Sequence, residues 1–269
     1  MLILLLIALC SGVGKGLYWA KKGFSLRRIA GPVKVELIRW SDEANGALDQ
    51  PFRFLGRGRQ CFAFESLDGK YVLKFPRTDI YQKPFREIVS KANERDKREK
   101  FVLESMRIAF DELKEETGSL GIHFGQTADL GEELHLIDSL GFSYRIPRQR
   151  ASFVLQMKQP ILMKCFLEAT TPQEKEKILG SLIDFVVVRG KKGIWNKDES
   201  FLRNYGFDGE RGYQIDIGSF YHRPDAVASI RDTLHPVRSW LMKKDPEIVP
   251  YFDTTLELKL SLELGRNEK

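Results

Sequence analysis

The stretch LGRGRQCFAFE at residues 55–65, followed by DGKYVLKF at residues 68–75, decides the fold that we predict for this chain. Apolar residues alternate with polar or small ones through residues 61–65, as in a strand with one buried face. The Asp-Gly pair that opens the second segment is a strong hairpin signal between two apolar runs. The sequence therefore predicts a strand, a glycine turn, a second strand, a tight turn and a third strand.

Three residues of this stretch form a candidate phosphate site. Gly56 and Gly58 are spaced G-x-G, and Lys74 lies among apolar neighbours in the third strand. Glycines allow backbone N–H groups to approach a phosphate closely, and a fixed ammonium group can neutralise its charge. A structural hairpin explains the two glycines alone equally well, and an alternating strand explains a surface lysine.

This arrangement resembles the N-lobe of the protein-kinase-like superfamily, in which a glycine-rich loop covers the nucleotide phosphates and a strand lysine holds them. Gly56, Gly58 and Lys74 match that pattern. Cys61 stands where the third glycine is usual, and Ala63 replaces the usual valine.

A second group of polar residues follows downstream. Residues 193–207 predict a loop and a strand that carries Asn204, and residues 212–220 predict a strand that ends at Asp216-Ile217-Gly218. Such a hairpin holds an amide oxygen close to a carboxylate, which suits hard oxygen ligation of Mg²⁺. The sequence therefore predicts Asn204 and Asp216 as metal ligands, with Asp198 upstream to orient or deprotonate an acceptor hydroxyl.

The order of these motifs across about residues 50 to 220 is that of the kinase-like superfamily. The resemblance implies binding of ATP with Mg²⁺, and Lys74 and Asp216 facing one cleft between two lobes. It also implies that the strand at residues 151–157 leads into the hinge that holds adenine, which points to Gln156 and Met157.

In a kinase-like N-lobe, a helix glutamate pairs with the strand lysine. The predicted helix spans about residues 86–116, with an apolar face at helical spacing in its second half. Glu104 lies beside that face and is our candidate for the partner of Lys74. Glu94 is the alternative, and an ordinary surface glutamate is the third reading.

Several residues depart from the superfamily pattern, and these departures point to a second possible function. There is no His-Arg-Asp motif, and Asp198 lies one residue further from Asn204 than is usual, so that Glu199 occupies the usual spacing. No Ala-Pro-Glu segment follows Asp216. We therefore expect weak or absent phosphoryl transfer with nucleotide and metal binding retained. The alternative to a phosphotransferase is a pseudokinase, or an interaction module at the membrane without turnover.

The chain is also similar as a whole to an uncharacterised group of kinase-like proteins from chlamydia-type intracellular bacteria. The matching segments are residues 56–74, residues 116–124 (ETGSLGIHF), residues 192–194 with 204–206, and residues 214–216. This resemblance implies no established activity. It implies an acidic residue at the position of Asn196.

Composition bounds the remaining possibilities. The 269 residues are 42% hydrophobic and 30% charged, which is ordinary for a globular protein. The net charge of +6 is spread along the chain, and basic and aromatic residues do not interleave on one strand set, so we expect no nucleic-acid partner. The three cysteines show no pairing or metal spacing, which argues against a disulfide scaffold or a zinc site.

The N-terminus begins with an apolar run at residues 1–14, and the nearby charges all follow it. A spanning helix needs roughly 20 apolar residues, a length reached by counting to Ala20 with Lys15 snorkelling. By the positive-inside rule, we expect a membrane anchor or signal-like segment with the globular part in the cytoplasm. A buried core helix is the alternative.

The fold class that we predict is α+β, with two lobes of a protein-kinase-like fold. Residues 1–28 form the anchor or signal-like segment, residues 29–158 a mainly antiparallel N-lobe, and residues 159–269 a reduced helical C-lobe. The expected ligands are ATP and Mg²⁺, and the acceptor substrate is not indicated by the sequence.

Overall fold

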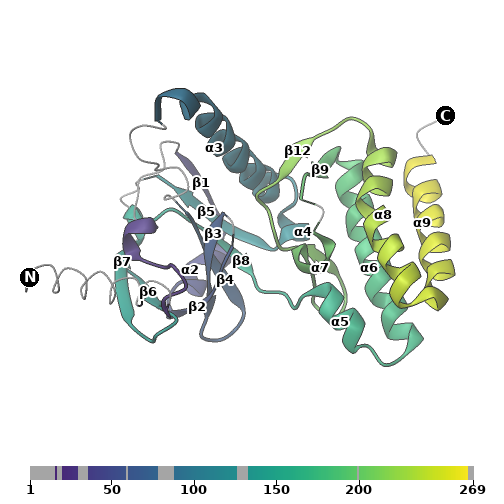
Figure 1. The fold of residues 1–269 in the computed structure, drawn as a ribbon, viewed down its shortest axis with the longest axis horizontal. Helices are drawn as coiled ribbons and strands as arrows, with labels where there is room; N and C mark the ends of the chain where they lie inside the picture. Colours follow the sequence, from purple (N-terminus) through teal and green to yellow (C-terminus); the bar gives the residue numbers. More distant parts are fainter. Residues whose placement is uncertain are drawn as a thin grey trace, which may run out of the picture. The chain divides into compact units, whose positions relative to one another are not determined.

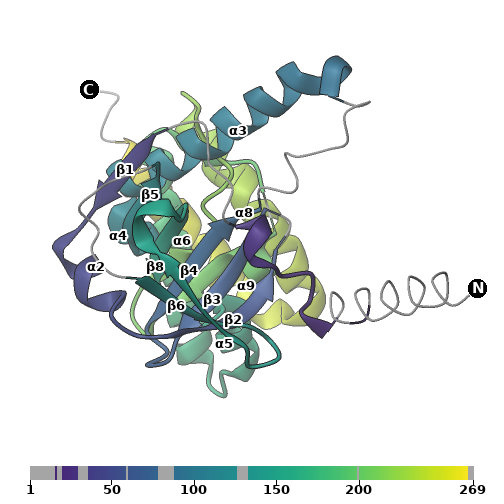
Figure 2. The same ribbon diagram turned by 90° about the vertical axis from the view of Figure 1, so that its left-hand side faces the viewer.

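The computed structural model (Figures 1 and 2) divides the chain into two compact units. Unit 1 comprises Met1–Asp96 and Leu120–Lys158, and unit 2 comprises Lys97–Ser119 and Gln159–Lys269. The α+β prediction is confirmed, because a large, mainly antiparallel sheet lies in the first unit and helices dominate the second. The structure describes residues 16, 20–29, 36–58, 60–77, 88–125, 133–198 and 200–265, without the side chains of residues 88–96, 98, 99, 150 and 264.

The sheet contains eight described strands in the order β1-β5-β8-β4-β3-β2-β6-β7. Neighbours pair antiparallel at β1–β5, β2–β3, β3–β4, β4–β8 and β6–β7, whereas β2 pairs parallel with β6. The strand that carries Lys74, β4, thus lies in the interior of the sheet. The bounds are β1 Leu37–Trp40, β2 Phe52–Arg57, β3 Cys61–Ser66, β4 Tyr71–Pro76, β5 Ser119–Phe124, β6 Glu133–Ile137, β7 Ser143–Pro147 and β8 Phe153–Met157.

Aromatic side chains build the core on one face of this sheet. Alternation along β3 and β4 places Phe62 opposite Phe75 and Phe64 opposite Leu73, and all four are fully buried. The rings meet edge to face, for example Phe64 on Phe75 at 5.6 Å between centroids, a geometry that aromatic quadrupoles favour. Figure 2 shows β2, β3 and β4 side by side. The predicted three-stranded arrangement is confirmed.

The tight turn between β3 and β4 forms as predicted at Asp68-Gly69. Gly69 adopts a left-handed φ of 73°, which only glycine adopts without cost. Asp68 Oδ1 accepts hydrogen bonds from Ser66 Oγ (2.6 Å) and from the backbone N–H of Lys70 (3.0 Å). The turn is therefore specified by its own side chains.

Residues that follow the apolar N-terminal run pack onto unit 1. Phe24 is 2% exposed and its ring lies 5.1 Å from that of Phe64. Lys21 Nζ lies 3.0 Å from Asp138 Oδ2 and donates to the Tyr144 hydroxyl (2.6 Å). Residues 20–29, around the 3-10 helix η1 (Leu26–Arg28), are thus part of the folded unit.

The predicted anchor itself lies outside the described residues, since residues 1–15 are not among them. Within the part of the chain that the structure describes, no helix combines the length and the apolar character that membrane crossing requires. Membrane attachment stays a prediction.

Unit 2 is built around the helices α6, α8 and α9, which lie side by side in Figure 1. Their apolar faces form one core that includes Leu182, Leu234 and Phe252, each at most 1% exposed. The smaller elements position the candidate site. The bounds are α3 Ile88–Asp111, α4 Lys114–Thr117, α5 Leu162–Glu168, α6 Pro172–Lys191, β9 Ile194–Asn196, α7 Phe201–Asn204, β10 Tyr205–Phe207, β11 Gly212–Gln214, β12 Phe220–His222, α8 Ala226–Lys244, η5 Pro246–Ile248 and α9 Val249–Leu264; in unit 1, α2 is Asp42–Ala47 and η4 is Arg148–Arg150.

Local signals account for the start of α6 and the end of α4. Thr171 and Glu174 form a capping box, and Pro172 occupies the first helical turn of α6. Gly118 ends α4 with a left-handed φ of 61°. Gly190 lies inside α6 although glycine often ends a helix, and a Cβ there would stand 2.4 Å from Ile230 Cγ1. That close packing, rather than a helix stop, explains the glycine.

A buried histidine in β5 leads to a pH prediction. His123 is fully buried, and its Nδ1 donates to the Ala151 carbonyl at 2.7 Å. Burial lowers the pKa of His123, against a smaller opposite effect of that hydrogen bond. The neutral ring is therefore favoured in the folded state, while the unfolded chain takes up a proton below about pH 6.5.

We expect the free energy of unfolding to fall as pH drops below about 6.5, with a contribution from His123 of at most about 1.4 kcal/mol per pH unit. Chemical denaturation at pH 7 and pH 5 measures this slope. In His123→Gln the slope should be shallower. An unchanged slope in that variant would show that His123 does not carry the effect.

Candidate functional site

The glycine turn joins β2 to β3 with a bulge. The register shifts between Phe54 and Gly56, and the Gly58 N–H donates to the Cys61 carbonyl at 2.8 Å. Neither Gly56 nor Gly58 is among the glycines with positive φ, and nothing described lies within 4 Å of where a Gly56 Cβ would stand. Backbone conformation and packing therefore do not require glycine at position 56.

Four strands bring a row of residues into register around Lys74. Gly56 pairs with Ala63, Ala63 with Lys74, and Lys74 with Val154. Because side chains alternate along β4, Lys74 projects from the face opposite Leu73 and Phe75 of the aromatic core. The lysine is half-buried. The structure thus brings Gly56 and Lys74 to one face of the sheet.

The predicted adenine contacts lie at the end of β8. Gln156 pairs with Val72 and is 2% exposed, and it shares the face of Lys74 by strand alternation. Met157 pairs with Tyr71 and is 44% exposed. The Lys158 N–H donates to the Lys70 carbonyl at 2.7 Å, which holds the end of the strand in place. The roles of Gln156 and Met157 stay predictions.

In unit 2, a backbone hydrogen bond joins the segments that carry Asn204 and Asp216. The Ile215 N–H donates to the Asn204 carbonyl at 2.7 Å, so Asp216 directly follows the residue that is bonded to Asn204. Asn204 is not on a strand as expected: it is the last residue of α7, directly before β10. The short helix forms because the Arg203 and Asn204 N–H groups both donate to the Ser200 carbonyl.

The side chains of Asn204 and Asp216 each carry an oxygen of the type that a hard cation prefers. Asp216 Oδ1 accepts from the Gly218 N–H at 3.2 Å, and Asn204 Nδ2 donates to the Asp198 carbonyl at 3.5 Å. No described donor contacts Asp216 Oδ2 or Asn204 Oδ1. Neither oxygen is among the buried polar atoms that lack a hydrogen-bond partner. Across the described ranges no three His, Cys, Asp or Glu side chains form a metal-binding group, so the candidate is this amide and carboxylate alone.

Asp198 lies in the loop before α7, in the same unit. Its N–H donates to Asn196 Oδ1 (2.9 Å), and its Oδ1 accepts from the Ser200 N–H (3.1 Å). These bonds fix the Asp198 carboxylate, and the Asp198 carbonyl accepts from Asn204 Nδ2. The alternative at the usual spacing, Glu199, lies outside the described residues.

Glu104 is engaged on its own helix. Its carboxylate accepts a bidentate interaction from Arg107, with Nη2 to Oε1 at 2.7 Å and Nε to Oε2 at 3.0 Å, and the hydrogen bonds from Arg107 lower the Glu104 pKa. The side chain is 52% exposed. The alternative Glu94 belongs to α3, but its side chain is not described. Pairing of either glutamate with Lys74 stays a prediction.

Sequence reasoning missed Ser105. This α3 residue is fully buried, and its Oγ donates to the Ile217 carbonyl (2.5 Å) and accepts from the Phe220 N–H (2.6 Å). It therefore holds both sides of the turn that follows Asp216. The signal was present, because Ser105 interrupts the apolar face formed by Val102, Met106 and Ala109.

The close packing around Gly206, in β10, leads to a stability prediction. A Cβ at Gly206 would stand 2.6 Å from Gln159 Cβ. We expect Gly206→Ala to lower the free energy of unfolding by about 1–3 kcal/mol, the usual cost of overpacking. Gly46→Ala, in α2 with nothing within 4 Å, is the control and should not destabilise. Equal denaturation midpoints for both variants would contradict the close packing.

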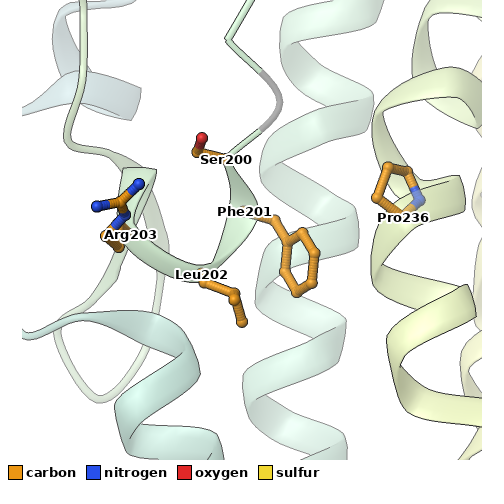
Figure 3. A pocket seen from close by; sticks show the side chains of 5 residues that line it. All are labelled: Ser200, Phe201, Leu202, Arg203 and Pro236. Atoms are coloured by element: carbon orange, nitrogen blue, oxygen red, sulfur yellow. The ribbon is translucent and has the colours of Figure 1, made fainter. Parts of the chain in front are cut away.

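A pocket of about 260 Å³ lies at α7 and is shown in Figure 3. Figure 3 shows Phe201 on the side of Pro236 from α8, while Arg203 points to the opposite side of α7. None of the predicted site residues lines it, so it is distinct from the Asn204–Asp216 pair. The lining residues are Ser200, Phe201, Leu202, Arg203 and Pro236.

Several solved structures resemble this chain at low sequence identity. No family model matches the chain, and no curated protein matches it. A structure of WbdD with a kinase inhibitor matches at 18% identity and a TM-score of 0.38, over 76% of this chain and 45% of WbdD.

A structure described as the bifunctional kinase-methyltransferase WbdD matches at 17% identity and a TM-score of 0.36, over 74% of this chain and 43% of that chain. The Rv3197–erythromycin complex from Mycobacterium tuberculosis matches at 11% identity and a TM-score of 0.35, over 77% of this chain and 55% of Rv3197. The chain thus matches about half the length of these proteins or less. The function proposed below rests on the residues of this chain.

Proposed function

We propose that this protein binds ATP together with Mg²⁺. The observation that carries the proposal is the Ile215–Asn204 hydrogen bond, which joins the segments of Asn204 and Asp216, while no described donor engages Asn204 Oδ1 or Asp216 Oδ2. An amide and a carboxylate oxygen are the ligands by which kinase-like proteins hold magnesium beside the nucleotide phosphates.

Unit 1 supports the phosphate half of the proposal. Lys74 offers an ammonium group on the sheet face that also carries Gly56, where neither packing nor φ demands a glycine. Close approach of a phosphate to the backbone is a reason for glycine at such a position. In this proposal Gly56, Gly58 and Lys74 hold the phosphates, Gln156 and Met157 contact adenine, and Asn204 and Asp216 hold Mg²⁺.

Phosphoryl transfer to an unidentified acceptor is the finer proposal, with Asp198 as the residue that orients the attacking hydroxyl. The Asp198 carboxylate is fixed by the Ser200 N–H, which favours a defined orientation. The second candidate, a nucleotide-binding pseudokinase, is favoured by the replacement of the usual neighbours of this aspartate by Asn196 and Lys197.

Turnover and binding measured together separate the two candidates. Purified protein is incubated with ATP and Mg²⁺, and product formation and nucleotide affinity are followed for the wild type and for Asp198→Asn. Turnover that is lost in Asp198→Asn with affinity retained supports phosphoryl transfer. Saturable binding with no turnover in either protein supports the pseudokinase. The absence of binding in both contradicts the proposed function.

A further inference from the structure

A buried guanidinium group is linked through Gln214 to Asn204, one of the two candidate metal ligands. Arg189 of α6 is 1% exposed, and no described carboxylate forms an ion pair with it. Its Nη1 donates to Gln214 Oε1 (2.8 Å), its Nη2 donates to Thr233 Oγ1 (2.9 Å), and its Nε is buried without a partner. Burying an arginine charge without a counter-ion is expensive, so its presence calls for a reason beyond stability.

The hydrogen-bond chemistry of Arg189 determines how Gln214 is oriented. A guanidinium group only donates, so Gln214 must present its oxygen to Arg189. The Gln214 Nε2 is thereby directed to the Asn204 carbonyl, to which it donates at 3.2 Å. Gln214 is fully buried, so no solvent replaces these partners.

The same carbonyl accepts the Ile215 N–H and so joins the segments of Asn204 and Asp216. If the Gln214 amide were reversed, its oxygen would face the Asn204 carbonyl and repel it. We propose that Arg189 is a positioning residue for the proposed metal ligands Asn204 and Asp216: by fixing the Gln214 amide, it keeps the two backbone segments that carry them joined. This inference rests on the proposed function for its consequence, but its structural part is testable without nucleotide.

Three variants test the proposal. Arg189→Met replaces the buried cation with an apolar side chain of similar length, which often leaves stability unchanged or raises it. Gln214→Glu keeps an acceptor for Arg189 and supplies it with a counter-ion, but cannot donate to the Asn204 carbonyl in its charged form. Thr233→Val is the control, because it removes the other hydrogen bond of Arg189 and leaves the Gln214–Asn204 contact.

The first readout is hydrogen exchange of the Ile215 amide in the full-length protein without ligand. We expect exchange about tenfold faster than in the wild type for Arg189→Met and Gln214→Glu, and within about twofold for Thr233→Val. The amides of β3 and β4, in unit 1, serve as an internal reference. Wild-type exchange rates at Ile215 in both test variants would overturn the proposal.

The second readout is ATP affinity with Mg²⁺ and with EDTA. The two test variants should lose about tenfold in the Mg²⁺-dependent affinity and retain the affinity measured in EDTA. An equal loss in both conditions would mean general damage and contradict a positioning role. If the wild type binds no ATP, the proposed function fails and Ile215 exchange alone decides the inference. If Arg189→Met does not fold, Gln214→Glu decides it.

Discussion

Asp138→Ala is expected to lower the free energy of unfolding by about 3–5 kcal/mol, because it removes a buried carboxylate and leaves the Lys21 ammonium group without its charged partner. The Asp138 side chain is fully buried, and Lys21 Nζ lies 3.0 Å from its Oδ2. The Tyr144 hydroxyl and the N–H groups of Leu140 and Phe142 also donate to this carboxylate. One substitution therefore leaves several donors unpaired.

The same carboxylate makes the free energy of unfolding depend on pH, and Asp138→Ala should change that dependence. Burial acts to raise the Asp138 pKa, but the hydrogen bonds from Lys21, Tyr144 and the backbone outweigh it and hold the pKa below its usual value. A lowered folded-state pKa stabilises the protein above the usual pKa of about 3.9, and this stability is lost as pH falls through the folded value. Asp138→Ala should remove that part of the acid dependence.

Denaturation by urea at pH 7 measures the effect of Asp138→Ala. Asp232→Ala, an exposed carboxylate 3.8 Å from Arg223, is the matched control and should change stability by less than about 1 kcal/mol. Equal losses for the two variants would contradict the account of residues 20–29 as an integral part of unit 1.

Asp216→Asn is expected to reduce the Mg²⁺-dependent affinity for ATP by about 100-fold, because it removes the charged ligand of the proposed metal pair. The substitution preserves shape, and the amide oxygen that it introduces can still accept from the Gly218 N–H, which donates to Asp216 Oδ1 in the wild type. Stability should therefore change little, while affinity in EDTA remains as in the wild type.

Asp232→Asn is the control for this binding experiment, since it also removes one carboxylate from unit 2 but lies in α8. Fluorescence titration with a labelled ATP analogue, in Mg²⁺ and in EDTA, supplies the comparison. Identical Mg²⁺ dependence in wild type and Asp216→Asn would exclude Asp216 as a metal ligand.

Local sequence signals predicted those parts of the fold that local chemistry determines. The Asp68-Gly69 turn forms where the sequence predicts it, because it is closed by hydrogen bonds between residues a few positions apart. The strand β6 was missed: it is short, and its parallel pairing with β2 is a long-range contact that alternation alone does not specify. The 19-residue helix α8 is also hard to predict from local signals, because Pro236 lies inside it. Tertiary packing outweighs the local penalty of that proline.

The sequence indicated the polar segments of the candidate site but not their local conformation. The order of Asp198, Asn204 and Asp216 indicated the polar loop and turn, yet the sequence did not show that Asn204 ends a short helix. Glu104 looked available because it borders an apolar face, whereas its i+3 neighbour Arg107 engages it. Ser105 and Arg189 act through partners more than 20 residues away in sequence, and no local pattern identifies such contacts.

The most direct test of the central claim is a calorimetric titration of ATP into the purified protein, in Mg²⁺ and again in EDTA. We predict saturable binding that Mg²⁺ tightens by at least about tenfold. Lys74→Met should weaken the binding, whereas Lys70→Met should not, because Lys70 is an exposed lysine in the turn before the same strand. No saturable binding in either condition, or equal affinity for ATP in the wild type and in Lys74→Met, would contradict the account.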